Sequence, residues 1–569
     1  MPAARILIGG ESFRRIREEN CYYIDKTGLI EKLLSHNPPM VSLFTRPRRF
    51  GKTLNMTMLR DFLDIRQDSR EIFAGLSVSE NRSLCDAWMN QHPVLFISLK
   101  YLEGTRFEHA LGQFQEVISR QCIDTAYLLQ SEHIDPSEKE KLSLLKNGTG
   151  DLRLLENSLL TLCRALHAHW GKPAILLIDE YDVPLARAEQ KGYYEQMVSF
   201  LRNLLGAALK TNMSLQFAVL TGCLRIARES IFTGLNNFRC YGISEPDFAD
   251  SFGFTAQEVD ALLAHTGFSD RKELMREWYD GYSFGSVQGI YCPWDILLYV
   301  DDLQSHPDAR PRTYWSNTSS NSIVRTFIGR TDLNISDKFE ALINGMCVQA
   351  RIVETLTYDS LHSSEDNLWS ILYLTGYLTS ASEAQIAACG ITPLPGKTCL
   401  RIPNREVREI FMESIAAWFT DSMLEMDRTP LFTAFWNGDA ADFMRRLSRI
   451  LLTTISYHDY REDFYHAVLT GIFVGSGYAV ASNRESGLGR ADIIIKDQKN
   501  ARAAVIEVKH SRTAAQLPQL SEDALSQIKA QDYAAPLQGL YEEITLWGMA
   551  FFQKRCMVRA EKAVAMQPF

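Results

Sequence analysis

The sequence of 569 residues lacks the marks of several protein classes. It has eleven cysteines but no C-x-x-C pair and no regular cysteine spacing, which favours reduced thiols over disulfides or a zinc site. No apolar run approaches the ~20 residues that a membrane-spanning helix needs. The first residues, MPAARILIGGESF, contain no long apolar segment of a secretory signal. We therefore expect a cytoplasmic protein with no membrane partner.

Composition and charge are those of a soluble globular chain. Hydrophobic residues make up 46% of the sequence and charged residues 23%. The net charge of −9 gives no overall attraction for nucleic acid, so any nucleic-acid surface must be a local patch. The length exceeds what one hydrophobic core organises, and we expect about three domains.

The first third of the chain alternates short apolar segments with amphipathic ones. Four apolar segments are typical of β-strands, at residues 40–45, 92–99, 173–179 and 215–221. The segment PAILLID at 173–179 is almost continuously apolar, as in a buried parallel strand. Strands separated by helices predict an α/β domain whose parallel sheet carries helices on both faces.

Two further regions follow this α/β pattern. Residues from about 245 to 430 have mostly helical periodicity and predict a helical lid or connector. From about residue 431 the pattern becomes helix, strand, strand, strand, helix, strand, which predicts a second α/β domain. The predicted parts are residues 1–244, 245–430 and 431–569.

A candidate phosphate loop follows the first predicted strand. The octamer RPRRFGKT is similar to the pattern G-x-x-x-x-G-K-[ST], with Arg46 in place of the first glycine. Lys52 is expected to neutralise the β- and γ-phosphate oxygens of ATP, and Thr53 to bind Mg²⁺. Backbone N–H groups at the start of the next helix would cradle the phosphates. The other loop residues expected at the nucleotide are Pro47, Arg48, Arg49, Phe50 and Gly51.

A second half of this site lies at the end of the third predicted strand. In ILLIDEYD, Asp179 and Glu180 directly follow an apolar run, as in a Walker B motif. Asp179 would bind Mg²⁺, directly or through water, and Glu180 would polarise the attacking water. A strand that ends in a solvated acidic turn would look the same, but both motifs occur in the order that a nucleotide site requires.

Three residues at the end of the fourth strand and after it are further candidates for the nucleotide site. Thr221 stands where a sensor group could touch the γ-phosphate. Arg225 and Arg228 could serve as arginine fingers, supplied in cis or by a second copy of the chain. Arginines on a helix are usually solvated, so the alternative is that Arg225 and Arg228 are surface residues with no role at the nucleotide.

The segment ADIIIKDQKNARAAVIEVKHS carries a candidate metal site. Asp492 opens one apolar strand pattern, and Glu507 and Lys509 close the next one about fifteen residues later. Residues two apart on a strand share a face, so Glu507 and Lys509 point the same way. Two carboxylates on adjacent strands suit Mg²⁺ or Mn²⁺. Lys509 would orient or deprotonate the attacking water. An inter-strand salt bridge would show the same short pattern.

Flanking helices could complete this metal site. The segment REDFYHAVLTGIF predicts an amphipathic helix that carries Glu462, a possible third carboxylate. Gln527 lies in the predicted helix DALSQIKAQDY and could touch the scissile region or the catalytic lysine. His466 and His510 lie near these groups, and no His/Cys spacing supports zinc, so we expect both to be structural or next to the substrate.

Taken together, these motifs resemble the bacterial AAA-ATPase-like proteins with a C-terminal PD-(D/E)-x-K nuclease-superfamily domain. The resemblance covers nearly the whole chain and includes FTRPRRFGKTLNMTML, LLIDEYDVPL, WYDGYSFG, YWSNTSSNSIV, IPNREV and AAVIEVKHS. In that family RPRRFGK is the usual phosphate loop, so Arg46 is no defect of this chain. The resemblance implies a P-loop ATPase and a restriction-endonuclease-like α/β domain.

We expect ATP to control a Mg²⁺-dependent nuclease that acts on nucleic acid, with DNA as the expected type and Mn²⁺ as a possible substitute. One alternative is a nucleotide-dependent switch whose C-terminal domain grips nucleic acid without cutting it. Another is a signalling ATPase whose partner is protein and whose output is homo-oligomerisation. Intact Asp492, Glu507 and Lys509 favour the nuclease.

Overall fold

The computed structural model describes residues 5–35, 39–225, 232, 238–315, 336–356, 364–424, 429–454, 462–474, 476–486, 489–511, 513–552 and 555–563. The chain forms two compact units, residues 1–315 with 349–406, and residues 316–348 with 407–569. Helix α16 (Ser336–Ile343), which falls in the predicted middle part, belongs to the second unit. The division at 244 and 430 stays a prediction.

The first unit is built on a parallel sheet of five strands in the order β2-β3-β4-β1-β5. The first four strands match the predicted segments to within two residues at each end. Because β4 lies between β1 and β3, the carboxyl ends of these three strands meet at one edge, where open α/β sheets bind their ligands. The strands are β1 (Val41–Thr45), β2 (Val94–Ser98), β3 (Ala174–Asp179), β4 (Leu215–Gly222) and β5 (Phe238–Tyr241).

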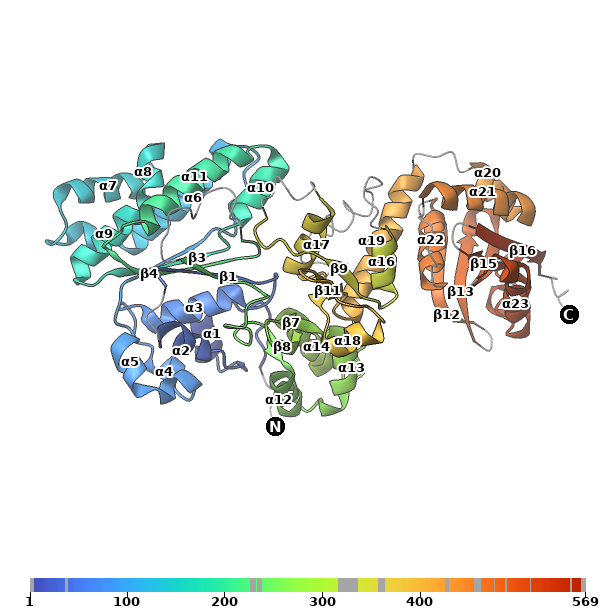
Figure 1. Cartoon of the computed structure of the whole chain (residues 1–569), viewed down its shortest axis with the longest axis horizontal. Coiled ribbons are helices and arrows are strands. Elements are labelled where there is room, and N and C mark those ends of the chain that lie inside the picture. Colours follow the sequence, from blue (N-terminus) through green and yellow to red (C-terminus); the bar gives the residue numbers. More distant parts are fainter. Residues whose placement is uncertain are drawn as a thin grey trace. The chain divides into compact units, whose positions relative to one another are not determined.

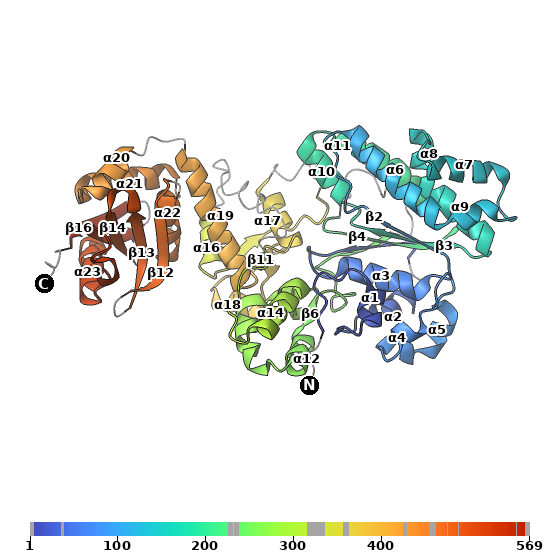
Figure 2. The same cartoon turned by 180° about the vertical axis from the view of Figure 1, so that it is seen from behind.

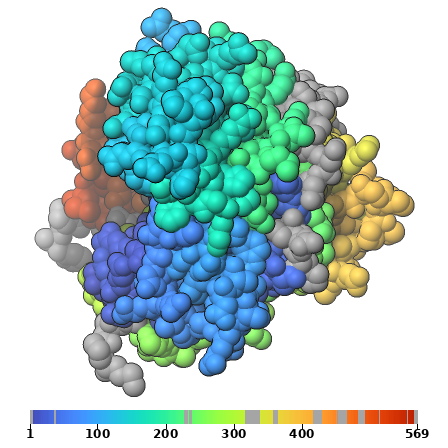
Figure 3. Space-filling view, turned by 90° about the vertical axis from the view of Figure 1, so that its left-hand side faces the viewer, coloured from blue at the N-terminus to red at the C-terminus, as the bar shows by residue number. Residues whose placement is uncertain are grey.

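Helices cover both faces of this sheet, which confirms the predicted α/β class. In Figures 1 and 2 the helices α1–α5 lie on one side of the sheet and α6–α11 on the other. Figure 3 views the two coverings from the end of the unit, with the later helices in cyan and the earlier ones in blue. The helices are α1 (Phe13–Glu18), α2 (Gly28–Leu34), α3 (Lys52–Leu63), α4 (Arg70–Phe73), α5 (Arg82–Trp88), α6 (Phe107–Asp124), α7 (Pro136–Lys146), α8 (Leu152–Glu156), α9 (Ser158–Trp170), α10 (Val183–Lys191) and α11 (Tyr194–Leu209).

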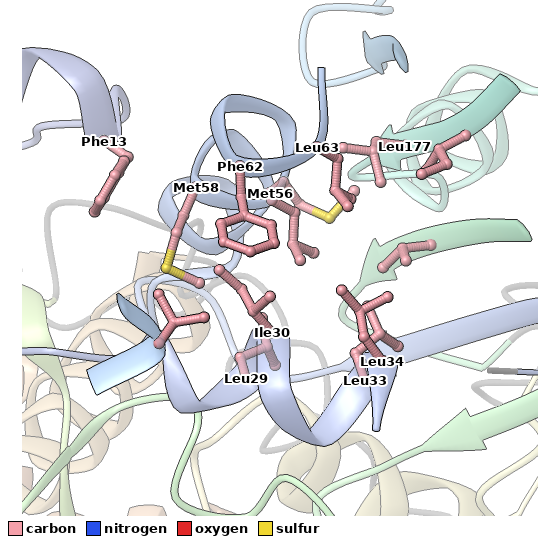
Figure 4. Close-up of a cluster of buried hydrophobic side chains, with 14 of the residues drawn as sticks. Phe13, Leu29, Ile30, Leu33, Leu34, Met56, Met58, Phe62, Leu63 and Leu177 are labelled. Atoms are coloured by element: carbon pink, nitrogen blue, oxygen red, sulfur yellow. The ribbon is translucent and has the colours of Figure 1, made fainter. Parts of the chain in front are cut away.

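An apolar core holds α3 against the sheet. Met56 and Phe62 of α3 lie among Leu29 and Ile30 of α2 and Leu177 of β3 (Figure 4). All five side chains are at most 1% exposed. Each side chain of this size contributes ~1.5–3 kcal/mol when it is fully buried. The helix that begins at Lys52 is therefore fixed firmly to the strands whose ends carry the acidic residues.

The rest of the first unit is mostly helical, as predicted, with two small three-stranded sheets of order β6-β8-β7 and β10-β11-β9. The strands are β6 (Phe254–Thr255), β7 (Tyr282–Phe284), β8 (Val287–Tyr291), β9 (Val348–Ala350), β10 (Thr379–Ser380) and β11 (Thr398–Arg401). The helices are α12 (Ala256–Thr266), α13 (Lys272–Tyr279), α14 (Pro293–Ser305), α17 (Glu365–Leu374), α18 (Glu383–Ala388) and the start of α19 (Arg405–Leu424).

Three of the motifs that carry the family resemblance meet in this region. Gly281 of WYDGYSFG has a φ of 122°, and a Cβ there would overlap the carbonyl oxygen of Pro403 in IPNREV. Glu406 of IPNREV is 1% exposed and accepts hydrogen bonds from the backbone N–H groups of Tyr314 (2.5 Å) and Trp315 (2.8 Å). These motifs therefore join separate segments of the fold.

The second unit contains a five-stranded mixed sheet of order β12-β13-β14-β15-β16. Only β14 and β15 run parallel, and the other neighbours are antiparallel. Leu546 faces the core under α23, whereas the next residue, Trp547, stacks on Phe435 of α20 at 4.9 Å. Helices thus cover both faces. The elements are α20 (Thr429–Trp436), α21 (Ala440–Thr454), α22 (Glu462–Val474), β12 (Ala479–Ser486), β13 (Gly489–Asp497), β14 (Arg502–His510), α23 (Leu517–Ala530), β15 (Glu543–Phe552) and β16 (Arg555–Lys562).

Within the described part of the chain, no helix combines the length and the apolar character needed to cross a membrane.

Candidate active sites

The phosphate loop connects β1 to α3 as the sequence predicts. β1 ends at Thr45, and α3 begins at Lys52. Gly51, the residue before the helix, has a φ of 83°, a left-handed conformation that glycine adopts without strain. The first N–H groups of a helix have no partner within it and can bind an anion. The loop therefore presents helix N–H groups beside the lysine and threonine of the motif.

Lys52 lies in the interior of this loop. Its side chain is 3% exposed, and Nζ donates to the carbonyl oxygens of Arg46 (3.2 Å) and Pro47 (3.1 Å). Nζ also lies 3.5 Å from Oε1 of Glu180 and 3.6 Å from Sγ of Cys223. Burial alone would lower the pKa of Lys52, but Cys223 and the nearby carboxylates outweigh it and raise the pKa. The lysine is therefore a desolvated, permanent cation.

Asp179 gathers the other predicted residues at the strand ends. Its Oδ2 accepts a hydrogen bond of 2.8 Å from Oγ1 of Thr53, and its Oδ1 accepts one of 2.6 Å from Oγ1 of Thr221. Thr221 Oγ1 in turn accepts the backbone N–H of Glu180 at 3.3 Å. Burial raises the pKa of Asp179, against the effect of the two hydroxyl donors. The structure thus brings Lys52, Thr53, Asp179, Glu180 and Thr221 together.

The sequence reasoning missed Asp182, which belongs to the same acidic turn. It is 1% exposed, and its Oδ2 accepts the backbone N–H groups of Cys223 and Leu224, both at 2.9 Å. Burial first, and then the charge of Glu180, raise the pKa of Asp182 to about 6. The last carboxylate of ILLIDEYD was a visible signal, but its partners become evident only from the sheet order.

Arg46 supports the loop from inside the protein. Its guanidinium is fully buried and donates to the carbonyl oxygens of Thr45 (2.9 Å), Tyr241 (2.8 Å) and Phe248 (3.0 Å). Burial lowers the pKa of Arg46 to about 10. The arginine that replaces the first glycine of the motif therefore ties the loop to β5 and to the segment after it, and its backbone carbonyl oxygen contacts Lys52.

The other loop side chains divide between packing and solvent. Phe50 is buried, with its ring 5.0 and 5.2 Å from two aromatic rings of β7. Pro47 is buried, and the guanidinium of Arg49 lies 3.9 Å from the ring centre of Trp294. Arg48 is exposed. Phe50 and Arg49 of the loop therefore pack against the region that follows the sheet. Direct roles of the loop side chains at a nucleotide stay predictions.

Of the two candidate arginine fingers, the structure describes Arg225. Arg225 forms an isolated parallel β-bridge with Thr355, just beyond the end of β4. Arg228 lies outside the described residues. The finger role of both stays a prediction.

Asp25 and Lys26 of YYIDKT, for which the sequence offers no mechanism, have a structural role. Lys26 Nζ contacts both carboxylate oxygens of Glu258 at 2.7 Å. Asp25 accepts the backbone N–H groups of Thr27 (2.8 Å) and Ser77 (2.7 Å). The two side chains fasten the amino-terminal segment to α12 and to the segment before α5.

In the second unit, Asp492 and Glu507 lie at the point where β13 and β14 separate. The antiparallel ladder runs from Asp497 with Arg502 to Ile493 with Ile506, and the same register places Asp492 opposite Glu507. There Oδ2 of Asp492 accepts the backbone N–H of Val508 at 2.8 Å. The two predicted carboxylates therefore sit side by side at the end of the ladder.

Lys509 and Gln527 both contact Glu507. Lys509 Nζ lies 3.0 Å from Oε1 of Glu507, and Gln527 Nε2 donates a short hydrogen bond to the same oxygen. Glu507 is 2% exposed, whereas the Lys509 side chain is 25% exposed. The predicted set Asp492, Glu507, Lys509 and Gln527 is therefore brought together.

A glycine allows α23 to deliver Gln527. Gly548 of β15 lies beside Glu507 in the parallel register. A Cβ on Gly548 would overlap the carbonyl oxygen of Ser521 and lie 2.5 Å from the backbone nitrogen of Leu525. The backbone of α23 thus rests directly on the sheet at this point, and Gln527 follows within the next turn.

The remaining metal-site candidates have mixed outcomes. The predicted helix is present as α22, which begins at Glu462, but the side chain of Glu462 lies outside the described residues, so the third carboxylate stays a prediction. His466 Nε2 donates to the carbonyl oxygen of Asp492 at 2.7 Å, a structural contact. Among the described side chains, no group of three or more His, Cys, Asp or Glu is arranged to hold a metal ion.

Comparisons with known proteins find a family match for each of the two regions that carry these sites. Residues 7–232 match the family model described as predicted AAA-ATPase, and residues 460–561 match the PD-(D/E)XK nuclease superfamily. An uncharacterized protein in the vnfD 5′ region of Azotobacter chroococcum mcd 1 is 25% identical over 577 aligned positions, which cover 97% of each chain. The chain therefore carries an AAA-ATPase-like domain at residues 7–232 and a domain of the PD-(D/E)XK nuclease superfamily at residues 460–561.

Proposed function

We propose that the chain binds and hydrolyses ATP, and that nucleotide binding controls a Mg²⁺-dependent nuclease in its C-terminal domain that acts on DNA. The observation that carries the ATPase half is the buried ammonium of Lys52, held by loop carbonyl oxygens and 3.5 Å from Glu180. A desolvated cation beside the first N–H groups of a helix suits the phosphates of a nucleotide.

The donor set beside Lys52 also suits Mg²⁺. The Thr53 hydroxyl and the Asp179 carboxylate meet at 2.8 Å, and both are the hard oxygen ligands that Mg²⁺ prefers. Mg²⁺ held by these groups would offset charge on the β- and γ-phosphates. Glu180 would accept the proton of the water that attacks the γ-phosphorus, while Thr221 holds the Glu180 backbone and the Asp179 carboxylate in place.

The nuclease half rests on Asp492 and Glu507, which face each other where β13 and β14 separate. Their oxygens suit Mg²⁺ or Mn²⁺, and a cation there would stabilise the charge that develops on a phosphodiester. Lys509 would orient or deprotonate the water that attacks the phosphorus. Gln527 would orient Glu507 through their hydrogen bond.

One observation favours the second candidate, a nucleotide-dependent switch that grips nucleic acid or protein without cutting. Lys509 and Gln527 both bond Oε1 of Glu507, so a cation must compete with them for that oxygen. If Lys509 and Gln527 keep this oxygen from the cation, the domain has the fold of a nuclease but binds its partner without cutting it.

One experiment separates these functions. The protein is incubated with supercoiled plasmid, linear DNA, single-stranded DNA and RNA, in Mg²⁺ or Mn²⁺, with and without ATP, while phosphate release is measured. Cleavage of DNA that depends on the metal and changes with ATP is the expected result. ATP turnover together with intact nucleic acid under every condition would favour the binding switch.

We also propose that ATP promotes homo-oligomerisation, with Arg225 or Arg228 completing the charge neutralisation in a neighbouring copy. An arginine finger supplied in trans can raise the rate by ~10³-fold or more. Light scattering with and without ATP tests this assembly. A chain that stays monomeric with ATP while turning it over rapidly would contradict it.

A further inference from the structure

The acidic turn after β3 is joined to the end of β4 by a dense set of hydrogen bonds. The backbone N–H of Tyr181 donates to the carbonyl oxygen of Thr221 at 2.9 Å, and the Tyr181 hydroxyl donates to the carbonyl oxygen of Leu224 at 2.7 Å. Asp182 accepts the N–H groups of Cys223 and Leu224, both at 2.9 Å. Two consecutive residues of the turn thus hold residues 221–224.

Between these anchors and Asp179 lies Glu180, whose backbone has a φ of 55°. A left-handed conformation costs a non-glycine residue roughly 1–3 kcal/mol, and it persists only when the surroundings over-determine it. Asp179 is held by two threonine hydroxyls on one side of Glu180, and the Tyr181 and Asp182 contacts hold the chain on the other. The surroundings therefore fix the unusual backbone of the proposed general base.

Asp182 is the side chain on which this arrangement depends most. Its Oδ2 is the acceptor for two consecutive amides, so its removal would leave both N–H groups without this partner. The approach is close, because a Cβ on Gly222 would lie 2.7 Å from Oδ1 of Asp182 and 2.7 Å from the Tyr181 ring. The carboxylate and the glycine of β4 thus fit together with no room for a further side chain.

We infer that Asp182 is a positioning residue of the ATPase, which fastens the turn of Glu180 to the end of β4 and so sets the general base relative to Lys52 and Thr221. This inference rests on the proposed ATPase function and deepens it. The hydrogen bonds of Asp182 join the acidic turn to the backbone of Cys223 and Leu224, so Asp182 acts on the position of Glu180 through the backbone. Its charge also acts on Lys52 and Glu180, and the asparagine variant separates this charge from the hydrogen bonds.

The test compares Asp182→Ala, Asp182→Asn and Asp25→Ala in the full chain. Asparagine keeps an oxygen that can accept the two amides, whereas alanine removes it. Asp25→Ala is the matched control, because Asp25 also accepts two backbone N–H groups but ties α2 to the segment at Ser77. Each protein is measured for the Kd of ATP, the kcat of hydrolysis, the melting temperature and the amide hydrogen exchange of residues 221–225.

Asp182→Ala should lower kcat at least about tenfold, part of the ~10²-fold that a 1 Å misplacement of a catalytic group can cost. The Kd of ATP should change little, and exchange at Cys223 and Leu224 should speed up. Asp182→Asn should retain most of the wild-type kcat. Asp25→Ala should lower the melting temperature without lowering kcat.

Two outcomes would overturn the inference. One is exchange at residues 221–225 that Asp182→Ala leaves unchanged, a result that does not depend on turnover. The other is a wild type that turns over ATP together with an alanine variant of equal kcat. By contrast, a wild type that neither binds nor hydrolyses ATP would contradict the proposed function, while the exchange data would still decide whether Asp182 holds the turn.

Discussion

The hydroxyl of Thr221 donates a hydrogen bond of 2.6 Å to Oδ1 of Asp179, across the boundary between β4 and β3. The same hydroxyl oxygen accepts the backbone N–H of Glu180 at 3.3 Å. One threonine therefore orients the proposed metal-binding carboxylate and the backbone of the proposed general base. Because Thr221 is 1% exposed, water cannot easily replace it.

Thr221→Val should slow ATP hydrolysis more than it weakens ATP binding. Valine has nearly the same shape but no hydroxyl, so Asp179 loses a donor and the Glu180 N–H an acceptor, at a cost of ~1–3 kcal/mol for each buried group left unsatisfied. Stopped-flow binding and phosphate release measure the two effects. Thr125→Val is the control, because this buried hydroxyl donates to the carbonyl oxygen of Gln121, away from the acidic turn. Equal loss of binding and turnover would contradict the orienting role.

Lys52→Ala should abolish ATP binding, and Glu180→Gln should retain binding but lose turnover. The lysine supplies the buried cation of the loop, whereas the glutamate acts on the attacking water, and loss of a transition-state group costs ~10²-fold or more in rate. Calorimetry and phosphate release provide the measurements. Lys172→Ala is a control, since Nζ of Lys172 contacts Gln91 instead. Wild-type turnover by Glu180→Gln would remove the general-base assignment.

Asp182 should give the stability of the first unit a distinctive pH dependence. Burial raises its pKa from 3.8 to about 6, so between about pH 6 and 4 the folded state binds a proton that the unfolded chain releases. The contribution of this group to the free energy of unfolding therefore rises as the pH falls through that window, by ~3 kcal/mol at most. Ionisation of the buried carboxylate opposes folding above pH 6.

Asp182→Asn removes this titration. Without nucleotide, the variant should be more stable relative to the wild type at pH 7 than at pH 4.5. Urea unfolding of both proteins at the two pH values measures the difference. An identical stability difference at both pH values would mean that the pKa of Asp182 is not raised.

Gly548→Ala should damage the second unit. A Cβ there would lie 2.5 Å from the backbone nitrogen of Leu525, so α23 must move away from β15 and carry Gln527 with it. Overpacking of this kind costs ~1–3 kcal/mol. Thermal unfolding and nuclease assays check the effect. Gly112→Ala, with open space around it in α6, is the control. A fully stable Gly548→Ala protein would contradict the close helix–sheet contact.

Much of this architecture can be read from the sequence. The strand of PAILLID is apolar because it is buried on both faces, and strand ends in a parallel sheet bring their following residues to one edge, so Lys52, Asp179 and Thr221 could be grouped in advance. Period-two spacing also placed Glu507 and Lys509 on one side of β14.

Other features depend on tertiary contacts that local patterns do not encode. Asp182 can accept the backbone N–H of Cys223 because β4 ends beside β3 in the sheet. From the sequence, Arg46 looks like one more cation of the loop. Its guanidinium instead donates to carbonyl oxygens of residues about 200 positions away. The contact of Gln527 with Glu507 requires the close approach of α23 at Gly548, which the sequence does not reveal.

The central claim, that one chain joins an ATPase to a metal-dependent nuclease, is tested most directly by nicking of supercoiled plasmid in Mg²⁺ with ATP, with ATP turnover followed in the same samples. Wild type and Asp442→Ala, which removes a partly buried carboxylate paired with Arg445 and Arg446, should cut. Asp492→Ala should neither bind Mn²⁺ at this site nor cut, and it should still hydrolyse ATP, because the ATPase residues belong to the other unit. Undiminished nicking by Asp492→Ala would contradict the account.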